Sequence, residues 1–374
     1  MRLSAIAAHV LRYSDPNDAG NARMTVLVRT ESSDGVVGWG EGIAMWPEAC
    51  KATVTIIEEG FFPLLRDAGE ISVAQAWELM RAHSWWYGEG GIASFALSAI
   101  DMSLWDIAGK EQGLPVSALL GGTVHDSLPA TASCHVNKAT LAECVAEVET
   151  YFDRGFRSVK LGLGKKGLSP IGQDPEQVVR FVAMLRRALG SEAEILVDIG
   201  NGISWDLATG IDVARRLRDL QVGWIEEPFY PTRLDDYRAL REAVDLPIAS
   251  GEREWTVAGY ERLLATGTVD VFGVDPARAE GVTGFRAVDA LVRRHNRTIN
   301  AHAWSTAITT AASLQLSLCS PAARLFELKP HPVVVQTELV DAPIVIADGR
   351  VRQPQGPGLG IAVVEDVVKR LALR

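Results

Sequence analysis

The stretch Ile195-Leu-Val-Asp198 is a short apolar run that ends in a carboxylate, and the runs ending at Glu226 and Glu252 repeat the pattern. Similar runs recur about every 25 residues from Leu128 onward, each followed by a helical stretch. Eight near-regular units of this length are typical of a (β/α) barrel. An open doubly wound sheet is the alternative, but no Gly-x-Gly-x-x-Gly follows the first run, so the barrel is favoured. The polar residues that end the eight runs are His135, Lys160, Asp198, Glu226, Glu252, Asp275, His302 and Glu327.

The segment before the repeats shows a different order of strand and helix signals. Two strand-like runs, 25–29 and 35–41, flank the turn signal Ser32-Ser-Asp-Gly35 and predict a hairpin. Residues 93–110 then place apolar side chains at helical spacing. We therefore expect an α+β capping domain over 1–125, a barrel over 126–340, and a C-terminal segment, 341–374, that packs back on the capping domain.

The composition excludes some classes of protein. The 374 residues are 47% hydrophobic and 22% charged, which is ordinary for a globular protein. The net charge of −10 and the lack of a basic run argue against nucleic-acid binding. Four scattered cysteines without a Cys-x-x-Cys pair indicate reduced thiols. With no signal-like N-terminus and no uncharged apolar run of about 18 residues, we expect a cytoplasmic protein that contacts neither membrane nor nucleic acid.

Three carboxylates, Asp198, Glu226 and Glu252, end consecutive predicted strands. In a barrel the C-terminal ends of the strands form the mouth where active sites lie. Carboxylates gathered there would repel one another unless a cation lay between them, and hard oxygen ligands suit Mg²⁺. A single acid at the start of a loop is more often a surface residue, but three on neighbouring strand ends favour a metal site.

Asp275 and His302 end the next two runs. At neighbouring strand ends the carboxylate would orient the imidazole and raise its basicity. A lone histidine at a strand end is more often structural, but beside the acidic triad a general base or acid is the better interpretation.

These motifs resemble the mandelate racemase branch of the enolase superfamily. The resemblance rests on Asp198, the Glu226-Glu-Pro and Gly251-Glu252 pairs, Asp275 with Gly281-Val-Thr-Gly284, and His302. Residues 96–110 and 115–121 are also similar to that family's N-terminal signature, so the resemblance covers nearly the whole chain. It implies a modified (β/α)7β barrel with a capping domain, and abstraction of a proton α to a carboxylate.

The resemblance also implies roles for individual residues. Mg²⁺ would be bound by the three carboxylates and would hold the substrate carboxylate, which explains how an acidic protein recruits an anion. Lys160 would assist electrostatically, and His302, oriented by Asp275, would be the base or the acid. Glu327 matches the position of a carboxyl that hydrogen-bonds the substrate, although a buried structural acid is nearly as good an interpretation. A homo-oligomer, dimer or octamer, is implied by resemblance only.

Two positions depart from the family pattern. Racemases of the family carry Lys-x-Lys at the end of the second strand, whereas this chain has Lys160-Leu-Gly162, so that the second base is missing and a gap is expected. Lys165 and Lys166 follow in the loop, where solvated side chains are the expected state. Gly200 also replaces a polar residue, which we expect to widen the site.

One-base chemistry favours dehydration of an acid sugar, aldonate or aldarate, to a 2-keto-3-deoxy acid. Cycloisomerisation of a sugar-acid lactone and epimerisation remain alternatives, as do a non-catalytic metal-dependent carboxylate binder and a barrel without metal. Substrate contacts are expected from Arg23 and Trp46, because loops of the capping domain close the barrel mouth in this family. His135, at the end of the first barrel strand, is a further candidate for substrate contact.

Overall fold

The computed structural model describes residues 1–165, 171–200 and 202–373. Eight parallel strands form one sheet, in the order β10-β9-β8-β7-β6-β5-β4-β11. Their bounds are β4 Leu128–His135, β5 Ser158–Gly162, β6 Glu194–Asp198, β7 Ile225–Glu226, β8 Ile248–Ser250, β9 Val271–Val274, β10 Thr298–Ala301 and β11 Phe326–Leu328. Seven helices connect them: α6 Leu141–Asp153, α7 Pro175–Leu189, α8 Leu207–Asp219, α9 Leu234–Ala243, α10 Val257–Ala265, α11 Gly281–Arg294 and α12 Ala307–Cys319.

In the closed barrel, the side chains of each strand alternate between the interior and the surrounding helices. In β6, Ile195 and Val197 pack toward the helices, whereas Leu196 points inward to a small cluster with Trp224 and Leu325. The barrel closes between β10 and β11, where a bridge joins Ile299 to the segment before β11. Eight strands and seven connecting helices confirm the predicted (β/α)7β barrel.

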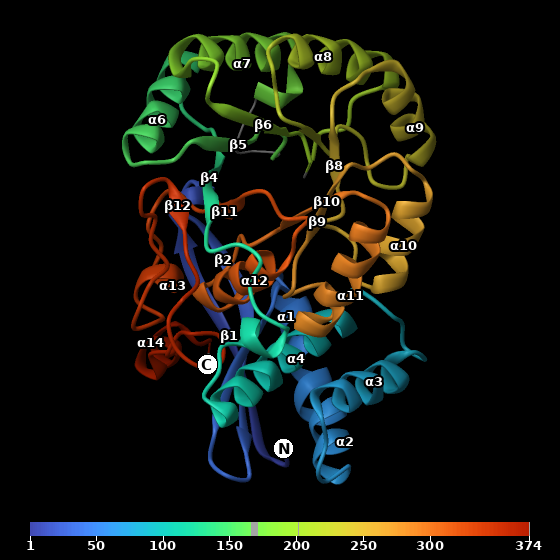
Figure 1. Cartoon of the computed structure of the whole chain (residues 1–374), viewed down its shortest axis with the longest axis vertical. Coiled ribbons are helices and arrows are strands. Elements are labelled where there is room, and N and C mark those ends of the chain that lie inside the picture. The colour runs from blue at the N-terminus through green and yellow to red at the C-terminus, as the bar shows by residue number, and fades with distance from the viewer. Residues whose placement is uncertain (166–170, 201, 374) are drawn as a thin grey trace.

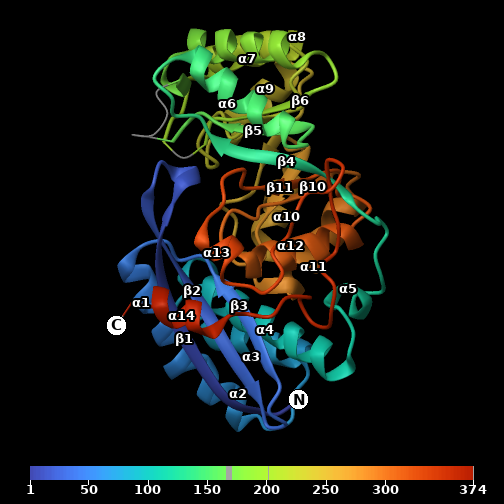
Figure 2. The same ribbon diagram turned by 90° about the vertical axis from the view of Figure 1, so that its left-hand side faces the viewer.

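The N-terminal domain is built on an antiparallel sheet of β1 Leu3–Asp15, β2 Asn21–Ser32 and β3 Val37–Gly42. Figures 1 and 2 show this sheet running from the helical lower end of the molecule up to the barrel, where the β1–β2 tip lies near β4 and β5. Its helical elements are η1 Pro16–Asp18, α1 Pro47–Thr55, η2 Ile56–Phe61, α2 Phe62–Asp67, α3 Val73–Ser84, α4 Ile92–Gln112 and α5 Val116–Leu119. The hairpin turn predicted at 32–35 joins β2 to β3.

Alternate glycines in β3 let helix α4 lie directly on the sheet. A Cβ atom at Gly40 would lie 1.9 Å from the carbonyl oxygen of Ala99, and one at Gly38 would lie 2.1 Å from that of Ser103. Both distances are far below a van der Waals contact, so only glycine fits here. The close approach fixes the position of α4 against the sheet.

We expect Gly40→Ala to destabilise the protein by about 1–3 kcal/mol, because the backbone of α4 must move away from the sheet. Gly60→Ala is the matched control: it lies in the helical segment η2, and the nearest atom to its added Cβ is 3.9 Å away. That control should be neutral or stabilising by about 0.5–1 kcal/mol. Thermal unfolding of both variants measures the difference, and equal midpoints would contradict the packing argument.

Helix α4 is a core helix, although by length and composition alone its 21 residues could span a membrane. In its most apolar window, 78% of the residues are buried inside the fold. It also carries Asp101, whose carboxylate accepts hydrogen bonds from the backbone N–H and the hydroxyl of Thr283 on α11. These contacts attach α4 to the barrel.

A second polar contact joins the two domains at the start of α12. Glu41 of β3 is fully buried, and its carboxylate accepts hydrogen bonds from the hydroxyl groups of Ser305, Thr306 and Thr309 and from two backbone N–H groups there. Carboxylates are stabilised at a helix N-terminus by the exposed N–H groups and the helix dipole. Glu41 thereby anchors the segment that follows His302.

The C-terminal segment returns to both domains. Strand β12 Arg350–Val351 pairs with β4, and Leu373 donates its backbone N–H to Val10 of β1. Figure 2 shows α14 lying across β1, with the C-terminus beside the N-terminal domain. The remaining elements are η3 Ile171–Gln173, α13 Val334–Thr337 and α14 Glu365–Leu371.

Candidate active site

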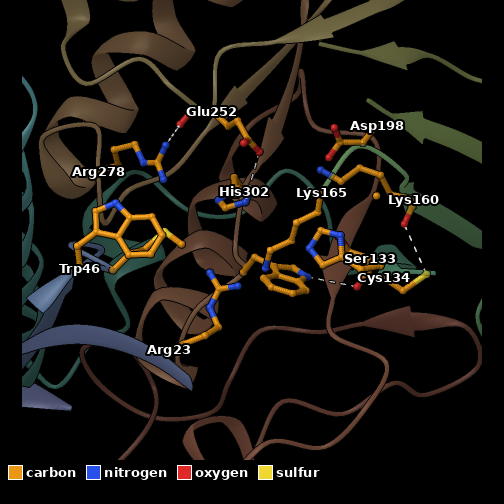
Figure 3. Close-up of a pocket in the computed structure, with 14 residues that line it drawn as sticks. Arg23, Trp46, Ser133, Cys134, Lys160, Lys165, Asp198, Glu252, Arg278 and His302 are labelled. Atoms are coloured by element: carbon orange, nitrogen blue, oxygen red, sulfur yellow. Dashed lines mark hydrogen bonds and ion pairs between the residues drawn. The ribbon is translucent and has the colours of Figure 1, made fainter. Parts of the chain in front are cut away.

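A cavity of about 310 Å³ lies at the mouth of the barrel, where the C-terminal ends of the strands face the N-terminal domain. In Figure 3, Asp198 and Lys160 lie on one side of this cavity, Trp46 and Arg23 lie on the other, and His302 stands between them. Its lining residues are Arg23, Met45, Trp46, Ser133, Cys134, His135, Lys160, Gly162, Lys165, Asp198, Glu252, Arg278, His302 and Trp304.

The three predicted metal ligands come together at one end of the cavity. Asp198 and Glu226 are the last residues of β6 and β7, and Glu252 follows β8 by two positions. One carboxylate oxygen from each lies within 4.8 Å of the others, and all three residues are buried. Neighbouring strand ends of one sheet produce this convergence.

Burial and mutual repulsion make two of these carboxylates hard to ionise. Burial and, to a smaller extent, the other acids raise the pKa of Asp198 to about 7 and that of Glu226 to about 8, although Lys160 lowers both. Burial alone would also raise the pKa of Glu252, but His302 and Lys160 hold it at about 2. The cluster holds more negative charge than its own cations neutralise.

Lys160 is the buried cation of this cluster. Its Nζ lies 3.3 Å from Glu226 Oε1 and 2.9 Å from Glu327 Oε1. Burial would lower the pKa of Lys160, but these carboxylates raise it well above its usual value, so the side chain is charged. Glu327 is 1% exposed and also accepts from Asn300 Nδ2 at 2.5 Å, and its Oε2 has no hydrogen-bond partner in the part of the chain that the structure describes. Glu327 does not line the cavity, so its contact with substrate stays a prediction.

His302 and Asp275 form a hydrogen-bonded pair. Asp275 directly follows β9 and His302 directly follows β10, and His302 Nδ1 lies 2.7 Å from Asp275 Oδ2. Asp275 is fully buried and its other oxygen accepts from the N–H of Ala277. If Nδ1 carries the proton, Nε2 is the basic atom; it lies 3.5 Å from Glu252. Burial would lower the pKa of His302, but Glu252 and Asp275 raise it above its usual value.

The gap expected beside Gly162 does not exist, because the ring of His135 fills it. A Cβ atom at Gly162 would lie 2.3 Å from His135 Nδ1, so the two side chains would exclude each other. The ring packs edge-on against Trp304, with centroids 4.8 Å apart, and among the described residues Nδ1 has no hydrogen-bond partner. Burial, followed by the charge of Lys165, lowers the pKa of His135 to about 4, so the ring is neutral near pH 7.

The expectation of a solvated Lys165 is wrong. Its side chain is 25% exposed, lines the cavity, and forms an ion pair with Asp18 at the tip of the N-terminal hairpin. The same carboxylate binds Arg23 Nη1 at 3.3 Å. The pairing is long-range in sequence, which is why the loop composition did not reveal it. Lys166 and Asn201 lie outside the described residues.

Family comparison settles the relationship of the chain to known proteins. Residues 143–367 match the family model described as "Enolase C-terminal domain-like", and residues 18–121 match "Mandelate racemase / muconate lactonizing enzyme, N-terminal domain". The chain belongs to the enolase superfamily. The resemblance drawn from the motifs is thereby confirmed.

Relatives in the superfamily act on acid sugars. The chain is 28% identical to D-galactarolactone cycloisomerase of Agrobacterium fabrum, with 98% of each chain covered. It is also 28% identical to D-gluconate dehydratase of Thermoproteus tenax, covering 96% of this chain and 72% of that one. The structure of 3,6-anhydro-D-galactonate cycloisomerase from Zobellia galactanivorans matches with a TM-score of 0.87, 27% identity and full coverage of both chains. The chain is an enzyme of this superfamily.

The donor set of this superfamily member suits a divalent cation. Three carboxylates with oxygen atoms within 4.8 Å of one another match the hard ligands that Mg²⁺ prefers. A cation there would also offset the repulsion that raises the pKa values of Asp198 and Glu226.

Two further predictions concern Trp46 and Gly200. Trp46 lines it and is 63% exposed, which places this ring at the entrance. Gly200 does not widen the site, because a Cβ there would lie 3.0 Å from Glu227 and 3.3 Å from Arg253, two residues paired at 2.9 Å. Sequence reasoning missed Arg278, which lines the cavity and donates to the carbonyl oxygen of Glu252 at 2.5 Å; no strand-end pattern marks it.

Proposed function

We propose that this enzyme removes the proton α to the carboxylate of an acid sugar and eliminates the β-hydroxyl as water, which yields a 2-keto-3-deoxy acid. The observation that carries the proposal is the His302–Asp275 pair beside the carboxylate triad. Names of relatives as acid-sugar dehydratases support the reaction class.

His302 removes the α-proton. Its Nε2 accepts the α-proton while Asp275 stabilises the imidazolium that forms, as expected for an oriented imidazole. Lys160 places a buried positive charge beside the substrate carboxylate as negative charge develops there. Mg²⁺ held by Asp198, Glu226 and Glu252 would supply the remaining positive charge for the enediolate.

The same histidine completes the elimination. The electron pair of the broken Cα–H bond forms the Cα–Cβ double bond, the Cβ–O bond breaks, and the imidazolium of His302 donates its proton to the departing hydroxyl. Water and an enol result, and the enol tautomerises to the 2-keto acid. The chemistry balances without an oxidant or reductant.

The surroundings of Gly162 favour this one-base reaction over epimerisation. Inverting a carbon centre needs a second base on the opposite face of the substrate. The space beside Gly162 holds a neutral imidazole of low pKa, His135, and the nearby Lys165 is tied to Asp18.

Cycloisomerisation of a sugar-acid lactone is the second candidate. It uses the same proton removal, but the ring oxygen leaves in place of a hydroxyl. Two cycloisomerases among the compared proteins favour it: each covers essentially the whole chain. The substrate, open acid or lactone, distinguishes the two reactions.

Incubation with open-chain aldonic and aldaric acids in D₂O tests the proposal. We expect deuterium exchange at the α-carbon of the unreacted substrate, read by NMR. We also expect a 2-keto acid to accumulate, read by carbonyl derivatisation. Turnover of lactones alone would favour cycloisomerisation. A product that is only a stereoisomer would exclude dehydration and would make Lys165 the candidate second base.

We further propose that the protein works in the cytoplasm as a homo-oligomer that contacts neither nucleic acid nor membrane. The acidic net charge and the reduced cysteines support this setting. Light scattering on the purified protein measures the oligomeric state, and a monomer would contradict the proposal.

A further inference from the structure

The wall of the cavity that faces the N-terminal domain carries two cations. Arg23 comes from β2 and Lys165 from the loop after β5, and both line the cavity. Their side chains are 12% and 25% exposed. Both bind one carboxylate, that of Asp18, which is buried and does not line the cavity. Two cations therefore share one anion at this wall.

The other nearby carboxylates, Asp15 and Glu41, have partners other than Arg23 and Lys165. Asp15, on the same hairpin, is already paired with Lys329 at 2.7 Å, and both side chains are at most 2% exposed. Burial and the charge of Arg23 lower the pKa of Lys165, although Asp18 and Asp15 raise it. Glu41 is buried, does not line the cavity, and accepts its hydrogen bonds from Thr25 and the start of α12. Within the described residues, the one carboxylate that contacts Arg23 and Lys165 is therefore that of Asp18.

The cation wall, formed by Arg23 and Lys165, keeps hydrogen-bond donors that a ligand can use. The Arg23 guanidinium lies over the ring of Trp304, 4.7 Å from its centroid, and its one hydrogen bond within the described residues is to Asp18. A guanidinium has five N–H groups, so most remain available to a ligand.

We infer that the substrate carries a second carboxylate, remote from the reacting carbon, which Arg23 and Lys165 bind. The substrate is then an open-chain aldaric acid rather than an aldonic acid. The inference rests on the proposed function, because the first carboxylate must lie at the Asp198, Glu226 and Glu252 end of the cavity. The enzyme would thus hold its substrate by an anion site at each end.

The expected discrimination is large because an aldonic acid places a neutral hydroxymethyl group at the cation wall. A partly buried cation that has no anion from the ligand costs far more binding free energy than a lost contact between neutral groups. A planar guanidinium also matches a carboxylate through two parallel hydrogen bonds, which a hydroxyl cannot reproduce. We expect kcat/KM to favour the diacid by about 100-fold or more.

The test compares acids that differ only at that terminus: galactarate with galactonate, and glucarate with gluconate. The ratio of kcat/KM for diacid over monoacid is measured in the wild type, Arg23→Gln and Lys165→Met. We expect a ratio of at least about 100 in the wild type and a loss of at least tenfold in each variant. Arg12→Gln is the matched control, since Arg12 is an exposed cation on the same hairpin, outside the cavity; its ratio should equal the wild type's.

A wild-type ratio near one would overturn the inference while dehydration itself stands. So would a ratio that survives in both Arg23→Gln and Lys165→Met. If neither acid is turned over, the proposed function fails, and calorimetric titration of the Mg²⁺-loaded protein decides the inference separately. Tighter binding of galactarate than galactonate by tenfold or more, lost in Arg23→Gln, supports the second anion site, and equal affinities refute it.

Discussion

Replacing His302 with asparagine should reduce α-proton exchange and turnover by about 10³–10⁴-fold, the upper part of the range for a general acid–base group. The effect is large because one imidazole serves both steps: it accepts the α-proton and then protonates the leaving hydroxyl. Asparagine keeps a polar side chain near Asp275 but cannot accept a proton at neutral pH. Exchange into substrate in D₂O, followed by NMR, measures the first step alone.

The control for this prediction is His295→Asn. His295 is an exposed histidine at the end of α11, outside the cavity, so its replacement should leave exchange unchanged. Asp275→Asn should slow exchange by about 10²-fold or more, since the imidazolium loses its buried partner. His302→Asn with wild-type exchange and an unchanged melting temperature would remove His302 from the mechanism.

The strand-end carboxylates could be predicted because their placement follows from local rules. A βα repeat sends the C-terminal ends of its strands to one mouth, so a polar residue at the end of each run is enough to place Asp198, Asp275 and His302 together. The hairpin and helix α4 could be predicted for the same reason, since turn residues and helical spacing are local signals.

The side of the site that faces the N-terminal domain could not be predicted, because its contacts join residues far apart in sequence. Lys165 looks like a solvated loop residue until Asp18, about 150 positions earlier, lies beside it. Likewise the absence of a side chain at Gly162 suggested a gap, whereas His135 on the adjacent strand occupies the same space. Strand pairing in register decides which side chain fills such a space, and one sequence cannot reveal it.

Asparagine in place of Asp198 should have opposite effects on the metal-free and the Mg²⁺-loaded protein. Without metal, three buried carboxylates crowd together, so removing one negative charge should raise the melting temperature. The amide oxygen can still accept the hydrogen bond that Gly200 donates to Asp198 at 2.8 Å, which keeps the local backbone intact. With Mg²⁺ the variant should lose the stabilisation that binding gives, about 2.7 kcal/mol at 100 times the dissociation constant.

Melting curves with EDTA and with a Mg²⁺ series separate these effects. The wild type should melt higher as Mg²⁺ rises, whereas Asp198→Asn should begin higher and respond little, with turnover lost. Glu192→Gln is the control, because Glu192 is an exposed acid just before β6 and should leave both curves unchanged. If EDTA and Mg²⁺ leave the wild-type melting temperature unchanged, the triad binds no cation, and the three carboxylates would have to share protons instead. In that event Lys160 alone would face the substrate carboxylate, and the proposed enediolate would lack the charge that makes it accessible.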